Sequence, residues 1–160
     1  MKTIGTAALV AALVAAASAD GLAQDTNYRK DIRLLVEVKC AACHGAGAPT
    51  LAEFLLDQKK YTAVMKGPRM DTYADLVMLI GWTDTGAIMR RLDDGTSALA
   101  GGKPGNMYQF LGATEEERQA NLRTFKAWVG PEAWNLKRWG ARGSVPAITK
   151  EELDKIQVKY

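Results

Sequence analysis

The only two cysteines and the only histidine of this 160-residue chain lie within five consecutive positions, as Cys40, Cys43 and His44. On a helix, residues three and four positions apart share one face, so the three side chains can converge on one bound group. A disulfide between the cysteines would close a very small loop and add little stability. The motif therefore indicates a chemical role, and the fold has to present this segment as a helix beside a binding site.

The N-terminus has the pattern of an export signal. Lys2 precedes a 14-residue apolar run from Ile4 to Ala17, which is short for a membrane span and suits a signal peptide. Small residues predict cleavage after Ala19, with Ala23 as a second candidate, and an uncleaved anchor is the alternative. We expect residues 1–19 to be a signal peptide and the mature protein to be periplasmic or otherwise exported, without an integral membrane span.

The charge of the chain excludes one class of partner. The signal segment holds one of the 21 basic residues and none of the 18 acidic ones, so the mature chain would carry a net charge of +2. This balance is not that of a nucleic-acid-binding protein, and partners would have to be recognised through local patches. The mature length suits one domain with a substantial core.

The spacing C-x-x-C-H is the attachment signal of c-type haem. Cys40 and Cys43 would each form a thioether with one vinyl group, and His44 would be the proximal ligand of iron. A zinc site would need a fourth ligand that no other Cys or His supplies. A thioredoxin-like dithiol needs several strands and leaves the histidine without a role, and two unreactive thiols fit an oxidising compartment poorly.

Hydrophobic spacing and capping residues predict a mainly helical chain. Thr50 and Thr114 are each followed three residues later by glutamate, which is the pattern of a capping box. Residues 32–38, "IRLLVEV", could also be a buried strand by periodicity. The expected helices cover residues 27–43, 50–65, 72–80, 87–92 and 114–129, a short one is capped at Thr149, and residues 94–106 form a loop by composition.

A second axial ligand would have to come from a methionine or a weaker donor, because no second histidine exists; otherwise the sixth position is open. Met78 and Met89 lie on predicted helix faces and Met65 ends a helix stripe, so these three are expected in the core. Met70 and Met107 lie in loops with Gly and Pro, from which a side chain can be brought over the haem.

Over residues 27–130 the chain resembles the monohaem class I c-type cytochromes. In that family a P-x-L motif follows C-x-x-C-H, and the carbonyl of its proline accepts the ring N–H of the histidine; Pro49-Thr50-Leu51 occupies that place here. The family places its axial methionine just before a C-terminal helix. Met107 matches this position, since it lies seven residues before Thr114, and Met70 is the alternative.

These observations predict a mainly α, cytochrome-c-like helical domain, residues 20–130, around one covalently bound haem c, with a C-terminal extension over residues 131–160. We expect an electron carrier that transfers single electrons between redox protein partners, not an enzyme. The alternatives are a haem-bearing subunit of a larger oxidoreductase or assembly, a haem enzyme or sensor with an open sixth site, and a dithiol oxidoreductase. Pocket residues are expected to be Leu51, Tyr108, Phe110 and Trp128.

The segment 131–143 combines Trp134 and Trp139 with basic residues. It is expected to pack its tryptophans on the domain, since Trp is highly buried on average. A docking surface for an acidic redox partner is the alternative.

Overall fold

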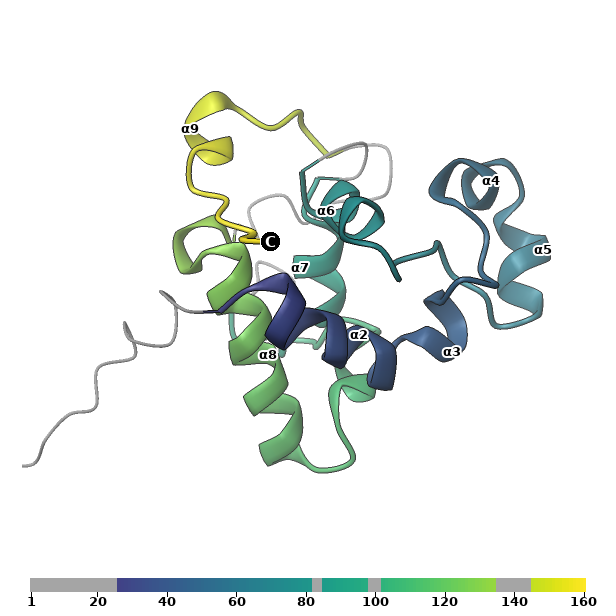
Figure 1. The fold of residues 1–160 in the computed structure, drawn as a ribbon, viewed down its shortest axis with the longest axis horizontal. Helices are drawn as coiled ribbons and strands as arrows, with labels where there is room; N and C mark the ends of the chain where they lie inside the picture. The colour runs from purple at the N-terminus through teal and green to yellow at the C-terminus, as the bar shows by residue number, and fades with distance from the viewer. Residues whose placement is uncertain (1–25, 82–84, 98–101, 135–144) are drawn as a thin grey trace, which may run out of the picture.

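The computed structural model describes residues 26–81, 85–97, 102–134 and 145–160, and no strand occurs among them (Figure 1). The prediction of a mainly helical chain is therefore confirmed for these residues. In chain order the helices are η1 (Tyr28–Ile32, π-helical), α2 (Arg33–Lys39), α3 (Ala41–His44), α4 (Leu51–Leu56), α5 (Gln58–Ala63), α6 (Tyr73–Gly81), α7 (Ala87–Leu92), η2 (Tyr108–Leu111, 3₁₀), α8 (Glu115–Val129), η3 (Pro131–Ala133, 3₁₀) and α9 (Lys150–Leu153).

The N-terminal helices η1 and α2 follow one another without a break and pack against α8. Their buried residues Ile32 and Val36 are spaced four apart, which places both on one face of a helix. An ion pair between Lys39 and Glu117 joins α2 to the first turn of α8. The alternative of a buried strand over residues 32–38 is excluded, because this segment is helical.

Helix α8 contributes the centre of the core. Its apolar side chains Leu122, Phe125, Trp128 and Val129 are buried, and Trp128 and Phe125 are the largest fully buried side chains among the described residues. The Thr114 side chain caps the helix by accepting the N–H of Glu117. The core also contains Tyr28, Ile32, Val36, Met70, Leu76, Leu79, Ile80, Ile88, Met89, Leu92, Tyr108, Leu111, Leu122 and Val129.

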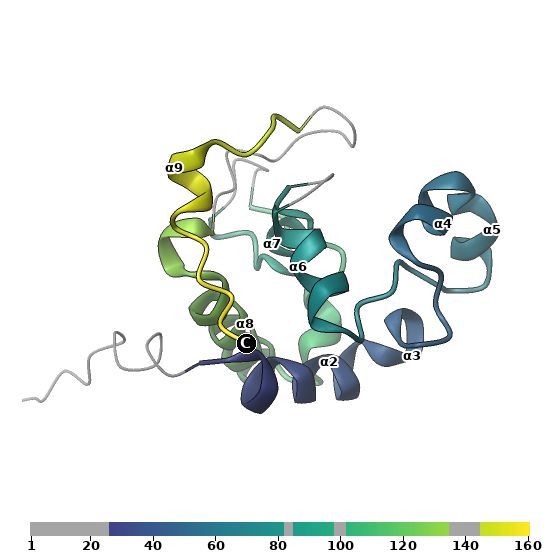
Figure 2. The ribbon, with the colours of Figure 1, turned by 45° about the horizontal axis from the view of Figure 1, so that its top comes forward.

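Helices α4 and α5 form a separate lobe next to α3, at the right of Figures 1 and 2. The predicted capping box of Thr50 and Glu53 is present. The single helix expected over residues 50–65 is divided at Asp57, whose side chain accepts the N–H of Lys60 and begins α5. No helix in the described ranges is both long and apolar enough to cross a membrane.

The last residues of the chain, 156–160, return from α9 to the end of α8. The backbone N–H groups of Gln157 and Val158 donate to the carbonyls of Val129 (3.0 Å) and Trp128 (2.9 Å). The Trp128 indole N–H donates in turn to the carbonyl of Lys159 at 2.9 Å. These contacts tie the end of the predicted C-terminal extension to the core.

The same terminal segment also holds the first helix. The N–H groups of Tyr28 and Arg29 donate to the carbonyls of Lys159 (2.8 Å) and Tyr160 (3.3 Å). The Tyr160 ring stacks on Tyr28 with centroids 5.8 Å apart, and the Arg29 guanidinium lies 4.4 Å from the Tyr160 ring centroid. Residues 156–160 thus connect the N-terminal and C-terminal helices, as the position of the C-terminus in Figure 2 shows.

Deleting residues 157–160 removes six hydrogen bonds and is expected to lower the free energy of unfolding by about 6 kcal/mol, at about 1 kcal/mol for each. The deletion also uncovers Trp128, which is fully buried. Denaturant titration of the haem-loaded protein measures this loss. The control is Tyr160→Ala, which keeps the main-chain hydrogen bonds and should cost about 1 kcal/mol. Equal losses in the two variants would contradict a structural role for the main-chain contacts.

Candidate haem attachment site

The turn from Cys40 to His44 is helical, as the sequence predicted, but the helix is interrupted at Cys40. Cys40 lies between α2 and α3, and its carbonyl accepts the N–H groups of both Cys43 (3.2 Å) and His44 (2.9 Å). Both cysteines are free thiols of intermediate exposure. Because residues i, i+3 and i+4 of such a turn share a face, the two sulfurs and the imidazole can address one ligand.

The imidazole of His44 is oriented by a backbone carbonyl. Its Nδ1 lies 2.7 Å from the carbonyl oxygen of Pro68. Since a carbonyl only accepts, Nδ1 must carry the proton, and the lone pair is left on Nε2. Burial lowers the pKa of His44, opposed by the hydrogen bond to Pro68 and assisted by the positive charge of Arg91. A neutral imidazole with a free Nε2 is the form that binds iron, so the site fits a haem.

Residues 67–70 form a short strap along the C-x-x-C-H segment. The N–H of Gly67 donates to the carbonyl of Cys43 at 3.0 Å, and the N–H of Met70 donates to the carbonyl of His44 at 2.8 Å. Gly67 lies directly against the imidazole: a Cβ there would be 2.1 Å from Cε1 of His44. Only glycine leaves room for the ring at this position.

The prediction that Pro49 accepts the ring N–H of His44 is wrong in this structure. The Pro49 carbonyl instead accepts the N–H of Arg69 at 2.8 Å, and Pro68 holds the imidazole. Pro49 therefore holds residue 69 of the strap, and it affects His44 only through the neighbouring Pro68. Sequence reasoning missed Pro68 because it lies 24 residues after the histidine, and its only signal was a Gly-Pro pair that indicated a helix break.

The Cys40 thiol is poorly suited to redox exchange. Burial, with a smaller effect of Cys43, raises its pKa to about 11. Catalytic dithiols work through a thiol whose pKa is lowered, because the thiolate is the nucleophile. With no strand among the described residues, the thioredoxin-like alternative also lacks its fold.

The methionines occupy different environments. Met89 is buried in the core as expected, whereas Met65 and Met78 are exposed by 74% and 37%, so the core prediction is wrong for these two. Met70 is buried and belongs to the strap. Met107 is partly buried and packs against the core just before η2.

The Met107 segment is hydrogen-bonded to α7. Its N–H donates to the carbonyl of Arg91 at 2.9 Å. Arg91 is also the cation whose charge lowers the pKa of His44. The Arg91 guanidinium donates to the side chain of Asn106 at 3.0 Å. Arg91 thus holds the loop that carries Met107 through both its main-chain carbonyl and its guanidinium.

Tyr108 follows Met107 and faces α8. Its hydroxyl donates to the carboxylate of Glu115. Burial is the first cause of the raised pKa of Tyr108, and the hydrogen bond from Tyr108 is the first cause of the lowered pKa of Glu115. Both directions match a neutral phenol donating to an ionised carboxylate.

The other predicted pocket residues differ in burial. Trp128 is fully buried beneath the terminal segment, Leu51 is partly buried at the edge of the core, and Phe110 is exposed by 54%. Trp128 therefore belongs to the core, and Phe110 presents its ring at the surface.

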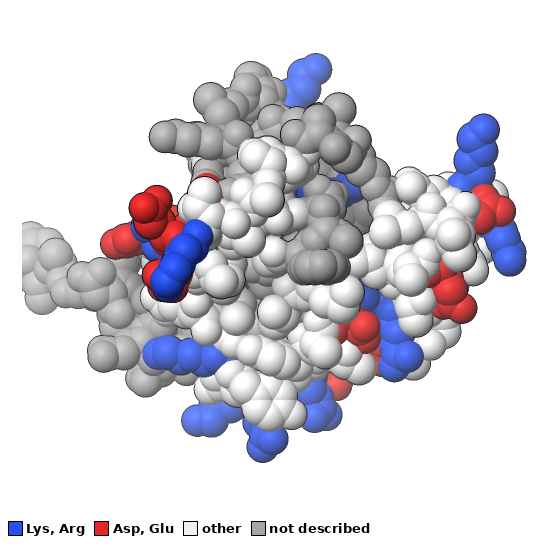
Figure 3. All heavy atoms as spheres, turned by 90° about the horizontal axis from the view of Figure 1, so that it is seen from above, with Lys and Arg blue, Asp and Glu red and all other residues white. Residues whose placement is uncertain are grey.

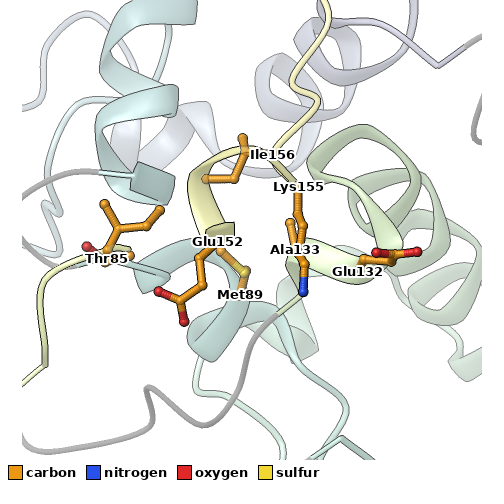
Figure 4. A pocket seen from close by; sticks show the side chains of 8 residues that line it. Thr85, Met89, Glu132, Ala133, Glu152, Lys155 and Ile156 are labelled. Atoms are coloured by element: carbon orange, nitrogen blue, oxygen red, sulfur yellow. The ribbon is translucent and has the colours of Figure 1, made fainter. Parts of the chain in front are cut away.

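A small cavity lies between α7, η3 and α9 (Figure 4). Its volume is about 40 Å³, enough for one or two water molecules and far too small for a haem. It is lined by Thr85, Met89, Glu132, Ala133, Ile148, Glu152, Lys155 and Ile156.

Part of the predicted docking segment 131–143 is described. The indole N–H of Trp134 donates to the carboxylate of Asp93 at 3.2 Å, and the Lys126 ammonium lies 5.5 Å from the Trp134 ring centroid. Trp134 packs on the domain, in agreement with the favoured interpretation. Residues 135–144, which include Trp139, lie outside the described residues.

Charged side chains are distributed around the margin of the molecule in Figure 3, and uncharged atoms cover most of the described surface in that view. Lysine and arginine lie beside aspartate and glutamate at the left and right of the view, and several lysine and arginine side chains gather along its lower edge.

Comparisons with known proteins identify the family of the chain. A family model described as "PccH Cytochrome c" matches residues 27–160. The solved structure of monohaem cytochrome PccH from Geobacter sulfurreducens is 54% identical, covers 84% of this chain and 98% of that chain, and superposes with a TM-score of 0.72. A search of curated proteins found no match.

These matches confirm the predicted resemblance to monohaem c-type cytochromes and the cytochrome fold. The family match also extends beyond residue 130, through the terminal segment that binds α8 and η1. The chain belongs to the PccH cytochrome c family.

Proposed function

We propose that the protein is an exported electron carrier in which His44 and Met107 are the two axial ligands of one covalently bound haem. When bound, the haem supplies an Fe(III)/Fe(II) couple that accepts and releases one electron. The chain attaches it through Cys40 and Cys43 and surrounds it with an environment of low polarity. Its electron donor and acceptor would be redox proteins.

The observation that carries the proposal is the hydrogen bond from His44 Nδ1 to the Pro68 carbonyl. It fixes the tautomer that leaves Nε2 free, restrains the ring and raises its basicity as a ligand. A histidine prepared in this way beside two thiols is what covalent haem attachment requires.

The placement of the methionines favours Met107 over Met70 as distal ligand. Met70 lies two residues after Pro68, on the strap that holds the Nδ1 edge of His44, whereas iron would bind at Nε2. Met107 lies outside this strap, in a loop that is hydrogen-bonded to α7, and it has the sequence position of the family's axial methionine. A thioether ligand favours Fe(II) and so raises the reduction potential.

Export is supported by the N-terminal sequence pattern, with its apolar run from Ile4 to Ala17. Residues 1–25 lie outside the described residues. Covalent attachment also suits an exported protein, because the cofactor cannot be lost by dissociation.

Optical spectra of Met107→Ala and Met70→Ala, in both oxidation states, test the ligation. The weak sulfur–iron band of the oxidised protein should be lost only in Met107→Ala, where the reduction potential should fall by roughly 0.1 V or more within the range that axial ligands span. Met70→Ala is the matched control: it should keep the band while losing about 2–5 kcal/mol of stability from a buried site. The reverse pattern would assign the ligand to Met70.

Ligand binding separates this function from a haem enzyme or sensor with an open sixth site. Carbon monoxide or cyanide that binds rapidly to the native protein would identify an open site. Slow binding, limited by departure of Met107, is expected.

A further inference from the structure

The segment that carries Met107 is fixed to the end of α7 by its main chain. The N–H of Gly105 donates to the carbonyl of Asp93 at 2.8 Å, and the N–H of Met107 donates to the carbonyl of Arg91 at 2.9 Å. The contact is close, since a Cβ on Gly105 would lie 2.3 Å from the Arg91 carbonyl oxygen. These bonds restrain the N-terminal side of Met107.

On its C-terminal side, Met107 continues into Tyr108, whose side chain connects the segment to α8. Tyr108 is 6% exposed, and its hydroxyl donates to Glu115. Gln119 Nε2 donates both to the Tyr108 hydroxyl (2.9 Å) and to the carboxylate of Asp94 (2.9 Å). The Tyr108 hydroxyl, with Gln119, thus joins the methionine segment to α8 and to Asp94, which follows α7.

This arrangement matters for a weak ligand. A thioether leaves iron more readily than an imidazole, so the position of the Met107 main chain determines how soon the sulfur returns. A segment held on both sides keeps Met107 preorganised for binding. Loosening one side lowers the fraction of time that its sulfur spends bound to iron. The hydrogen bond to the charged Glu115 is of the stronger, charge-assisted kind.

We propose that the Tyr108 hydroxyl, held by Glu115 and Gln119, is a positioning element for Met107 and limits how often external ligands replace the methionine on iron. The inference rests on the proposed function, in which Met107 is the distal ligand. The Tyr108 side chain acts on Met107 through the main chain of η2, which its side-chain hydrogen bonds tie to α8.

Imidazole binding to the oxidised, haem-loaded protein tests the proposal. Tyr108→Phe keeps the ring and removes the hydroxyl, and it should raise the association constant and binding rate of imidazole about tenfold. The matched control is Tyr73→Phe, which removes the hydroxyl that donates to the Val158 carbonyl at 2.7 Å in the terminal segment. This control should lose comparable stability and leave imidazole binding unchanged.

A double-mutant cycle tests the pathway through α8. Glu115→Ala alone should raise imidazole binding in the same direction as Tyr108→Phe, and the two changes together should be less than additive, since they remove one interaction. Gln119→Leu is a second variant for the same measurement if Tyr108→Phe loads haem poorly. It should raise the association constant of imidazole by less than Tyr108→Phe does.

The outcomes separate this inference from the function beneath it. If the sulfur–iron band survives in Met107→Ala, the proposed ligation is wrong and the inference falls with it. If the band is lost in Met107→Ala but Tyr108→Phe and Gln119→Leu bind imidazole as the wild type does, only the positioning role is wrong. Equal increases in Tyr108→Phe and Tyr73→Phe would likewise overturn it, because they would reflect general destabilisation.

Discussion

Replacing both Cys40 and Cys43 by alanine is expected to abolish covalent haem completely. The two thiols belong to one hydrogen-bonded turn that ends at His44, and among the described residues no other cysteine can substitute for them. Haem-stained denaturing gels of the mature protein measure the attachment. Wild-type protein should stain, and the double variant should not.

The single variants are the matched controls for this experiment. Cys40→Ala and Cys43→Ala each leave one sulfur, so each should keep a haem through one thioether, with a lower yield. Cys40 packs against the core, and burial raises its pKa to about 11, so its loss should also cost packing. Haem that resists denaturation in the double variant would refute attachment through these sulfurs.

The helices that could be predicted best are those whose ends are determined locally. Thr50 and Thr149 begin helices through capping boxes that involve only the next three residues. Helix α7 has the predicted limits, 87–92, because it follows Gly86 in a left-handed conformation (φ 76°) and ends before the buried Asp93. Such signals act over one helical turn, so sequence alone is sufficient to identify them.

The chemistry of the candidate site could also be predicted from the sequence, but the residue that orients His44 could not. The types and spacing of Cys40, Cys43 and His44 indicate haem attachment without any tertiary information. The choice of Pro68 over Pro49 as acceptor depends on where the chain returns after the α4–α5 lobe. No local pattern encodes a contact between residues 24 positions apart.

The terminal segment shows the same limit. Residues 156–160 have no periodicity that marks them as part of the core, yet they cover Trp128 and bind the first helix. Main-chain hydrogen bonds carry most of this contact. Because every residue except proline offers the same main-chain groups, such contacts leave little trace in the sequence.

Gly67→Ala is expected to disrupt the histidine side of the site more than any other single exchange of a small residue. The added Cβ would lie 2.1 Å from Cε1, 2.6 Å from Nδ1 and 2.9 Å from Nε2 of His44. Real Cβ atoms do not approach other atoms so closely, so the ring has to move. Moving it breaks the hydrogen bond to Pro68 and turns Nε2 away from its position.

Two variants isolate this effect. Gly47→Ala makes the same chemical change in the loop after His44, where a Cβ would meet nothing within 4 Å. Pro68→Ala retains the carbonyl that holds His44 Nδ1 and should keep most of the ligation. We therefore expect normal spectra from both, and from Gly67→Ala a protein that keeps thioether-bound haem with altered axial ligation.

Spectra and thermal unfolding of the haem-loaded variants measure the outcome. The free energy of unfolding of Gly67→Ala should fall by about 3 kcal/mol or more, at the upper end of what overpacking costs. The cost is high because the clash falls on the His44 imidazole, which is restrained by its hydrogen bond and is the proposed iron ligand. A Gly67→Ala protein with the wild-type spectrum and stability would mean that His44 can bind iron from another orientation. The Pro68 carbonyl would then not be what determines the geometry of the proximal ligand.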